Sequence, residues 1–421
     1  MERYDVSIDH LRLGTISDAD ITHSVHGTLL PSGGLLTRAF LQRLRARGIS
    51  QVSVDATHLG CLTDEGVRLL KQRRDGTQKN RDPGHDSLAS FFSDDSPLFA
   101  RRTNRAGEAY SEERAQRFRQ SLENAIGIFE VLGAEVQEVP SSMMAEMCGL
   151  PARLAEMLLE DADQSLSVLE CDATATPLSN RCSQMSLLAM STGMELGLSD
   201  SELASLGQAG LLHDLGLFLL PPKFRNPTTA YNASDLGIYQ SHPYLTLRLL
   251  EGVHRISELV RVLILQVHEN ADGSGFPRNF KSHRLHPLTR ILQVVEVYLS
   301  LVNPGQGRPA LLPHDALTFL LFQCQKGNFS PQVLRAFINQ ITLFPIGSHV
   351  LLNDGQQATV VRRNADQYDQ PFVIFNNDAR GQPQALAGTE LRIVSPLVRD
   401  QHSQMRLEKE ILASLTLDSL I

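Results

Sequence analysis

A histidine followed directly by an aspartate, His213-Asp214, is the pair in this chain whose residue types best suit metal chemistry. An imidazole nitrogen and a carboxylate oxygen are both good ligands for Fe, Mn or Zn. Neighbouring residues on a helix point about 100° apart, so the two side chains can face different metals, or one can bridge two. The alternative is a core histidine that is hydrogen-bonded by an aspartate at a helix end, and the pair alone does not decide between the two.

Further metal-ligand types follow downstream. His242 precedes a proline, His268 precedes a glutamate, and Glu296 lies in an apolar stretch. Each of them, taken singly, also has a structural explanation as part of a turn or a polar core. Together they predict one metal site, made by His213, Asp214, His242, His268 and Glu296. Between the last two lies a turn-forming segment with Asp272, Gly273, Gly275, Phe276 and Pro277, in which the glycines suit positions of positive φ.

The order of these residues resembles the HD-GYP family of bacterial proteins, a branch of the HD phosphohydrolases. The family pattern reads roughly His … His-Asp-x-Gly-Lys … His-Pro … His-His-Glu-x-x-Asp-Gly-x-Gly-Tyr-Pro … Asp. The resemblance covers roughly residues 170–340. It implies a helical bundle around a metal site, and most active members of the family cleave the second messenger cyclic di-GMP.

Three residues of that pattern are replaced by side chains that cannot do the same work. Arg181 stands where the family has its first histidine, and an arginine has no lone pair with which to ligate a metal. Val267 replaces the first of the two adjacent histidines, and Leu217 replaces the lysine. The resemblance therefore implies a reduced metal site with one divalent ion (Fe, Mn or Zn) or with none.

Other departures keep part of the original chemistry. Glu296 replaces the last aspartate but retains a carboxylate, and Phe276 replaces the tyrosine without its hydroxyl. Arg308-Pro309 remains from the phosphate clamp Arg-Pro-Tyr-Arg of the family. We expect Arg308 to contact a ligand. We expect Arg181 to take over the charge of a lost metal, with its planar fork bonded to both Asp214 and Glu296.

Three functions remain open at this point. The first is a degenerate HD-GYP protein that acts as a ligand-binding sensor or a scaffold in cyclic di-GMP signalling. The second is an active metal-dependent phosphodiesterase that yields pGpG or GMP on a reduced site. The third is a protein-interaction module that has lost its ligand too. Expected partners are cyclic di-GMP or a related nucleotide, signalling proteins such as diguanylate-cyclase domains, and a second copy of the chain.

Helices must position the site, because apolar residues recur at helical spacing on either side of it. Ser199 with Glu202 forms a capping box that begins a helix ending at His213-Asp214. Further helices are predicted from residue 234, carrying His242, over 256–269 with His268, and over 288–301 with Glu296. All the ligand positions are therefore expected on helices.

The expected fold is mainly α, with a small module at each end. Residues 1–62 read as an α+β module, 63–112 as a flexible linker and 113–342 as the helical HD-GYP domain. Residues 343–398 read as a small β-barrel-like domain, and 399–421 as a C-terminal helix. Within the linker, residues 71–108 are expected to be mobile and the first to be cleaved by protease.

Composition limits the partners. The net charge of −8 argues against binding to DNA, which needs a basic surface. Five scattered cysteines without a Cys-x-x-Cys motif predict reduced, mostly buried thiols in a cytoplasmic protein; they are Cys61, Cys148, Cys171, Cys182 and Cys324. The polar first residues lack a signal-peptide core, and no apolar run is long enough to span a membrane.

Overall fold

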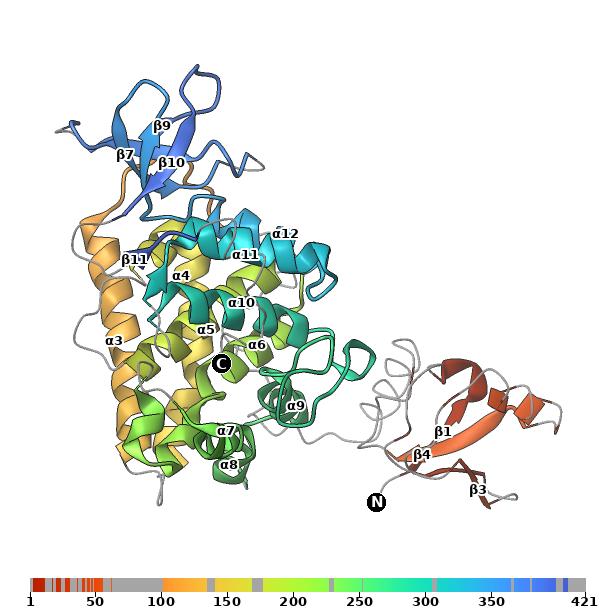
Figure 1. Ribbon diagram of the computed structural model, residues 1–421. Helices are drawn as coiled ribbons and strands as arrows, with labels where there is room; N and C mark the ends of the chain where they lie inside the picture. Colours follow the sequence, from red (N-terminus) through yellow and green to blue (C-terminus); the bar gives the residue numbers. More distant parts are fainter. Residues whose placement is uncertain are drawn as a thin grey trace. The chain divides into compact units, whose positions relative to one another are not determined.

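The computed structural model of the 421-residue chain describes residues 3–11, 17, 20–23, 27–30, 36, 40–41, 44–45, 47, 49–55, 62, 101–134, 141–168, 177–226, 231–251, 253–304, 309–364, 367–378, 381–398 and 404–407. The chain divides into two compact units, Met1–Pro83 and Gly84–Ile421. Each unit is described by itself (Figure 1).

The first unit contains a four-stranded antiparallel sheet. Its strands are β1 (Arg3–Ser7), β2 (Ile21–His23), β3 (Gly27–Leu30) and β4 (Gln51–Asp55), in the order β1-β4-β2-β3. Alternate residues of β4, Val52 and Val54, are buried, as period-two patterning requires. They share a core with Phe40 and Leu44.

The second unit is a bundle of helices whose described members span residues 112–341. They are α3 (Glu112–Ala134), α4 (Ser141–Ser167), α5 (Pro177–Glu195), α6 (Asp200–Leu212), α7 (Ala233–Tyr239), α8 (His242–Leu249), α9 (Glu258–Gln266), α10 (Thr289–Val302), α11 (Pro313–Gln325) and α12 (Pro331–Ile341). Short 3₁₀ turns follow α6 (Leu215–Leu219 and Pro222–Arg225) and precede α10 (Ser282–Arg284).

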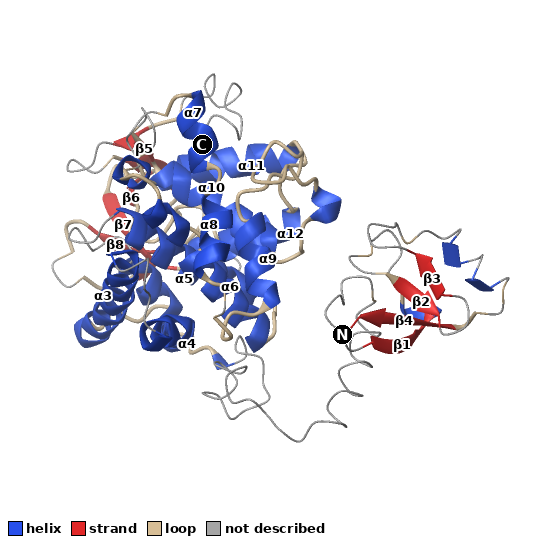
Figure 2. Cartoon of the chain, turned by 90° about the horizontal axis from the view of Figure 1, so that it is seen from below, coloured by secondary structure: helices blue, strands red, loops and turns tan. Residues whose placement is uncertain are grey.

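Helix α5 lies at the centre of this bundle and contacts α3, α4, α6, α10 and α12. Most of its side chains are buried, which is typical of a helix surrounded by others. Figures 1 and 2 show α5 and α6 side by side. Their close approach depends on Gly210, where a Cβ atom would lie 2.8 Å from the backbone nitrogen of Ser186. The beginning of α5 and the end of α6 are thereby held together, and both supply residues of the site.

A five-stranded antiparallel sheet follows the helices. Its strands are β6 (His349–Leu352), β7 (Gln357–Arg362), β8 (Phe372–Phe375), β9 (Gln384–Ala385) and β10 (Ile393–Leu397), in the order β10-β6-β7-β8-β9. Among the described residues, β9 and β10 are the two edges of the sheet and do not pair, so the strands form an open sheet rather than the expected barrel.

Two sequence predictions for the connecting segments fall largely outside the described residues. Of the predicted C-terminal helix, the described part contains β11 (Gln404–Met405), which pairs in parallel with β5 (Ala310–Leu311), and residues 408–421 lie outside the described part. The expected linker falls mostly on residues 63–100, which are also outside it. Its last part, 101–111, contacts the helical unit, because Thr103 donates to the carbonyl of Leu159 (2.9 Å) and Arg105 to that of Glu160 (3.0 Å).

Those carbonyls are available because α4 is kinked at Asp161, whose backbone is not helical (φ −162°, ψ 91°). The Asp161 carboxylate accepts from the backbone nitrogen of Gln164 (3.0 Å) and so caps the second part of the helix. Arg362 of β7 forms two hydrogen bonds of 2.9 Å with the same carboxylate and stacks over the ring of Tyr110 (4.7 Å). Arg114 of α3 adds a third at 2.7 Å. This buried ion cluster joins the sheet to the helices.

None of the described helices combines the length and the apolar character that crossing a membrane requires.

We predict that Arg362→Ala lowers the free energy of unfolding by about 3–5 kcal/mol, because it removes one partner of a buried ion pair. Urea unfolding followed by circular dichroism measures this change. Arg392→Ala, at the exposed residue that directly precedes β10, is the matched control and should change stability by less than about 0.5 kcal/mol. Equal effects of the two substitutions would contradict a structural role for the Asp161 cluster.

Candidate metal-binding site

The residues predicted to bind metal come from four parts of the bundle. His213 and Asp214 directly follow α6, and His242 is the first residue of α8. His268 lies two residues after α9, and Glu296 is on α10. Three of the five residues therefore lie just beyond a helix end, which corrects the expectation that all of them are on helices. The chain turns sharply where a helix ends. The side chains of neighbours such as His213 and Asp214 can therefore be directed toward one shared site.

The turn after α6 is fastened to α8 by one hydroxyl group. The buried Thr246 donates to the carbonyl of His213 (2.9 Å) and accepts from the backbone nitrogen of Gly216 (2.8 Å). The contact is so close that a Cβ atom on Gly216 would lie 2.3 Å from the carbonyl oxygen of His242. The glycine after the His-Asp pair is thus required by packing. It brings His213 and Asp214 against the start of α8.

The side chain of Asp214 is the centre of the cluster. Its Oδ1 lies 3.0 Å from Nε2 of His242 and 3.4 Å from Nε2 of His268. Its Oδ2 lies 3.3 Å from Nε2 of His213. Glu296 approaches from the other side, with Oε2 3.7 Å from His213 Nε2 and Oε1 3.5 Å from His268 Nδ1. The structure therefore brings together all five predicted residues, and all five are buried.

The orientation of the histidines fits a cation among them. Nδ1 of His213 lies 2.8 Å from the carbonyl of Gly210, and Nδ1 of His242 lies 2.7 Å from that of Tyr239. A carbonyl only accepts, so each Nδ1 donates, and in the neutral ring Nε2 keeps its lone pair. Nε2 of His242 shares a hydrogen bond with Nε2 of His268 (2.9 Å), but the lone pair of His213 Nε2 faces Oδ2 of Asp214, which also has only lone pairs. A metal ion between them, or a proton, removes this conflict, and metal-bound histidines commonly donate their other nitrogen to a backbone carbonyl.

Buried polar atoms without a hydrogen-bond partner also support a cation at this site. Among the described residues, His213 Nε2, Asp214 Oδ1 and Glu296 Oε2 are buried side-chain atoms without a hydrogen-bond partner. Such atoms are costly unless something absent from the protein chain satisfies them. Mutually close donor sets include His213 with His268 and Glu296, and Asp214 with His242 and His268. A mixture of imidazole and carboxylate ligands suits Fe, Mn or Zn.

Arg181 of α5 occupies the side of the site next to Glu296. Its guanidinium donates a very short hydrogen bond to Oε1 of that carboxylate. No hydrogen bond between Arg181 and Asp214 is present among the described residues, and its Nε is buried without a partner. The expectation that the guanidinium bonds both carboxylates is therefore wrong, because its fork is used on Glu296 alone.

The charges in the pocket set its pKa values. Burial raises the pKa of Asp214, but the surrounding histidines, His213 first, outweigh burial and hold it well below its usual range. Burial also opposes ionisation of Glu296, yet Arg181 lowers the pKa of that carboxyl below its ordinary value. Burial lowers the pKa of His213, and the Asp214 carboxylate more than reverses this. Both carboxylates are therefore ionised at neutral pH and present two negative charges to the cluster.

The turn after α9 forms one wall of the site. Glu269 accepts hydrogen bonds of 2.7 Å from the backbone nitrogens of Arg278 and Phe280, which closes the loop. Gly275 lies against the backbone of His268, where a Cβ atom would be 2.4 Å from its carbonyl oxygen. Phe276 is buried and stacks on the His268 ring, with 4.8 Å between the ring centres. The loop thus fixes the orientation of His268.

The other predicted loop residues complete this turn. Gly273 has a positive φ of 89°, and Pro277 follows Phe276 in a cis peptide bond. Asp272 accepts from the backbone and the hydroxyl of Ser274 and lies on the surface of the loop. Arg308, which we expected to contact a ligand, lies outside the described residues.

Comparison with known proteins agrees with this geometry. A family model described as "HD domain" matches residues 153–333, which include every residue of the cluster. The chain is 29% identical over 196 residues to a cyclic di-GMP phosphodiesterase of Pseudomonas aeruginosa, covering 46% of this chain and 47% of that protein. It is 23% identical over 189 residues to a cyclic di-GMP phosphodiesterase of Borreliella burgdorferi, covering 45% and 49%.

Residues 153–333 of the chain are therefore similar to an HD domain. This finding confirms the family resemblance predicted from the sequence. The chain spans about half the length of the curated relatives it matches. A solved structure, an HDG"Y"P protein from Bdellovibrio bacteriovorus, aligns with 80% of this chain and 98% of its own at 14% identity and a TM-score of 0.45.

Sequence reasoning missed two residues that shape this HD domain site. Thr246 lies four residues after His242, so both are on one face of α8, and that spacing was the available signal. Cys182 was expected only as a buried thiol, but its sulfur lies within 4.8 Å of the ligand atoms of His213 and Asp214. Its position directly after Arg181 gave no such signal, because adjacent residues on a helix point about 100° apart.

We predict that Thr246→Val lowers the free energy of unfolding by about 1–3 kcal/mol, because the buried backbone nitrogen of Gly216 loses its acceptor. Thermal and urea unfolding measure the effect. Thr246→Ser keeps the hydroxyl and serves as the control, which should stay much closer to wild type. A valine variant as stable as the serine variant would show that the hydroxyl does not fasten the turn.

We predict that Arg181→Ala destabilises the protein by about 3–5 kcal/mol, because Glu296 is left as an uncompensated buried charge. Arg181→His should be milder and should raise metal affinity, since it restores a ligand type. Urea unfolding with and without added Mn²⁺ or Zn²⁺ measures both effects. A change below about 0.5 kcal/mol for the alanine variant, the usual range at a surface position, would refute this role for Arg181.

Proposed function

We propose that this chain is a degenerate HD-GYP protein of bacterial cyclic di-GMP signalling. Its main role would be to bind, as a ligand sensor or as a scaffold for signalling proteins, rather than to hydrolyse a phosphodiester rapidly. The relatives named as cyclic di-GMP phosphodiesterases support the signalling context. The same ligand, or a related nucleotide, is the small molecule that we propose to test first.

The observation that carries this proposal is the ion pair between Arg181 and Glu296. A guanidinium occupies the place next to a carboxylate that the family pattern assigns to a metal. Hydrolysis with two metals needs an acidified hydroxide held between them. A fixed cation that cannot bind water in this way balances the charge but supplies no nucleophile. The loss of the lysine at Leu217 and of a histidine at Val267 points in the same direction.

A single divalent metal fits what remains. His213, Asp214, His242 and His268 would hold it, with Glu296 shared with Arg181, and the unpartnered atoms described above support this assignment. Such an ion supplies Lewis acidity toward a bound phosphate when present. The chain's own residues orient these ligands: Thr246 fixes the turn of His213, and Phe276 fixes the ring of His268.

A second candidate function follows from the same donors. Two mutually close sets of three buried ligands, His213 with His268 and Glu296 and Asp214 with His242 and His268, could serve an active metal-dependent phosphodiesterase that yields pGpG or GMP on a reduced site. The proposal and this alternative differ in the rate of turnover, which can be measured directly.

We predict that the purified chain binds cyclic di-GMP in a calorimetric titration and hydrolyses it slowly or not at all with added Mn²⁺ or Fe²⁺. Chromatography of the products measures hydrolysis, and metal analysis of the same sample measures occupancy. Asp214→Asn is the matched control, because it removes the central carboxylate at constant size. Turnover near ~1 s⁻¹ that this variant abolishes would favour the enzyme and overturn our proposal.

Absence of any binding would leave the scaffold role as the remaining form of the proposal. Its partners would then be signalling proteins, such as diguanylate-cyclase domains, or a second copy of the chain. Pull-down with a purified diguanylate-cyclase domain and sedimentation of the isolated chain distinguish these two cases.

A further inference from the structure

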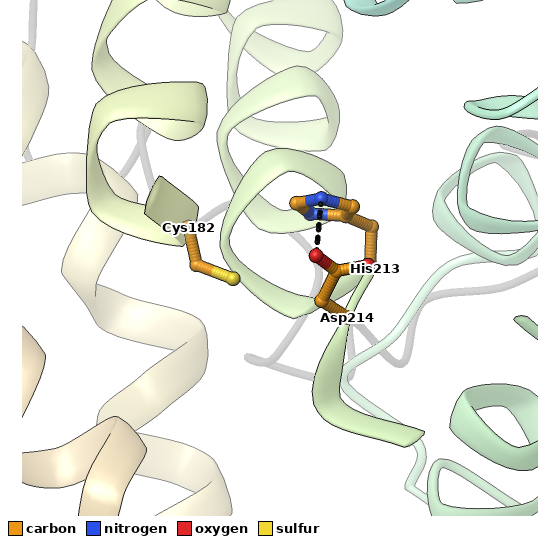
Figure 3. Close-up of side chains that lie close together, drawn as sticks. All are labelled: Cys182, His213 and Asp214. Carbon is orange, nitrogen blue, oxygen red and sulfur yellow. Dashed lines mark ion pairs between the residues drawn. The ribbon is translucent and has the colours of Figure 1, made fainter. Parts of the chain in front are cut away.

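Cys182 is a soft ligand type placed inside a cluster of harder ones. It lies on α5, and its side chain is buried. Figure 3 shows its sulfur extending from α5 toward the His213–Asp214 pair at the end of α6. The sulfur, a nitrogen of His213 and an oxygen of Asp214 all lie within 4.8 Å of one another. Three ligand types, from α5 and from the turn after α6, therefore converge on one small volume.

The two neighbours of this sulfur have capacity for another bond. Nε2 of His213 and Oδ1 of Asp214 are buried and have no hydrogen-bond partner. Because Nδ1 of His213 is engaged with the carbonyl of Gly210, Nε2 is the nitrogen left to ligate. A buried thiol beside two such atoms differs from an ordinary core cysteine, which packs among apolar side chains.

Arg181 explains why the ligand set can shift toward Cys182. Adjacent residues on a helix point in different directions, and Arg181 points to Glu296 while Cys182 points to His213 and Asp214. The guanidinium uses one oxygen of Glu296 and neutralises its charge, so that carboxylate is a weaker ligand. A thiolate from Cys182 would supply a replacement negative charge on the opposite side. Together, the Cys182 thiolate and the Asp214 carboxylate would balance the two positive charges of a divalent ion.

We propose that Cys182, together with His213 and Asp214, ligates a single divalent metal, and that this sulfur selects Zn²⁺ or Fe²⁺ over Mn²⁺. Thiolate ligands favour zinc and iron, whereas manganese prefers oxygen. On binding, the thiol loses its proton to solvent and the metal–sulfur bond forms, with no change of oxidation state. The inference rests on the single-metal site proposed above, and it adds a ligand that the family pattern does not contain.

X-ray absorption of the full chain loaded with one equivalent of Zn²⁺ tests this directly. We expect a zinc–sulfur shell at about 2.3 Å in wild type and in Cys148→Ser, a matched control at another buried cysteine. In Cys182→Ser the sulfur shell should disappear, and zinc affinity in a chelator competition should fall by at least about 100-fold. Mn²⁺ affinity should change much less, because sulfur contributes little to binding of that ion.

Cobalt provides a second measurement that needs no variant. Co²⁺ bound to a thiolate shows a sulfur-to-metal charge-transfer band in the near ultraviolet, and wild type should show it. A wild-type shell of nitrogen and oxygen alone, an unchanged zinc affinity in Cys182→Ser, or no bound metal at all would overturn the inference. The cyclic di-GMP titration is independent of these measurements. Nucleotide binding without a sulfur shell would reject Cys182 as a ligand and leave the proposed function standing.

Discussion

The main electrostatic constraint on this structure is the burial of two carboxylates close to the same histidine. Asp214 and Glu296 both approach His213, and burial of two such charges is unfavourable unless cations surround them. The protein provides Arg181 on one side and imidazoles on the other. The remaining imbalance is what makes the site a candidate for a metal ion, since the lone pair of His213 Nε2 and those of Asp214 point at one another. Helices α5, α6, α8 and α10 are placed so that residues on them or at their ends meet in this one cluster of charges.

The packing of the bundle makes that cluster possible. Helix α5 is enclosed on nearly all sides, and Gly210 of α6 lets the two helices approach closely at the backbone of Ser186. Adjacent residues of α5 then reach different parts of the site. Arg181 reaches Glu296, and Cys182 reaches the turn after α6. A change in one residue of the family pattern can therefore alter the charge balance, while its neighbour offers a new ligand without any change of fold.

A second buried ion cluster supports the C-terminal sheet. Asp161 ends the first part of α4, caps the second part and receives Arg362 from β7 and Arg114 from α3. The cost of burying these charges is offset by bidentate geometry and by the stacking of Arg362 on Tyr110. In both clusters an arginine from a distant part of the chain compensates a buried carboxylate, which lies within α10 at Glu296 and at the kink of α4 at Asp161.

The sequence by itself determined the resemblance to HD domain proteins, the helical class and the identity of the five clustered residues. The His-Asp pair, the spacing of the later ligands and the glycines of the loop are local features, and each reflects a local requirement such as a helix end or a positive φ. The capping box of Ser199 and Glu202 is equally local and begins α6 as predicted.

Only the tertiary structure decided which charged side chains pair with one another. The residues near Arg181 in the sequence do not indicate that its guanidinium bonds to Glu296 alone, 115 residues away. The kink at Asp161 is stabilised by Arg362, 201 residues further on, and Met405 is a strand residue because β5 lies beside it. The position of Cys182 against Asp214 depends likewise on how closely α5 and α6 pack. Contacts between distant segments set these features, and such contacts leave no periodic signal in the sequence.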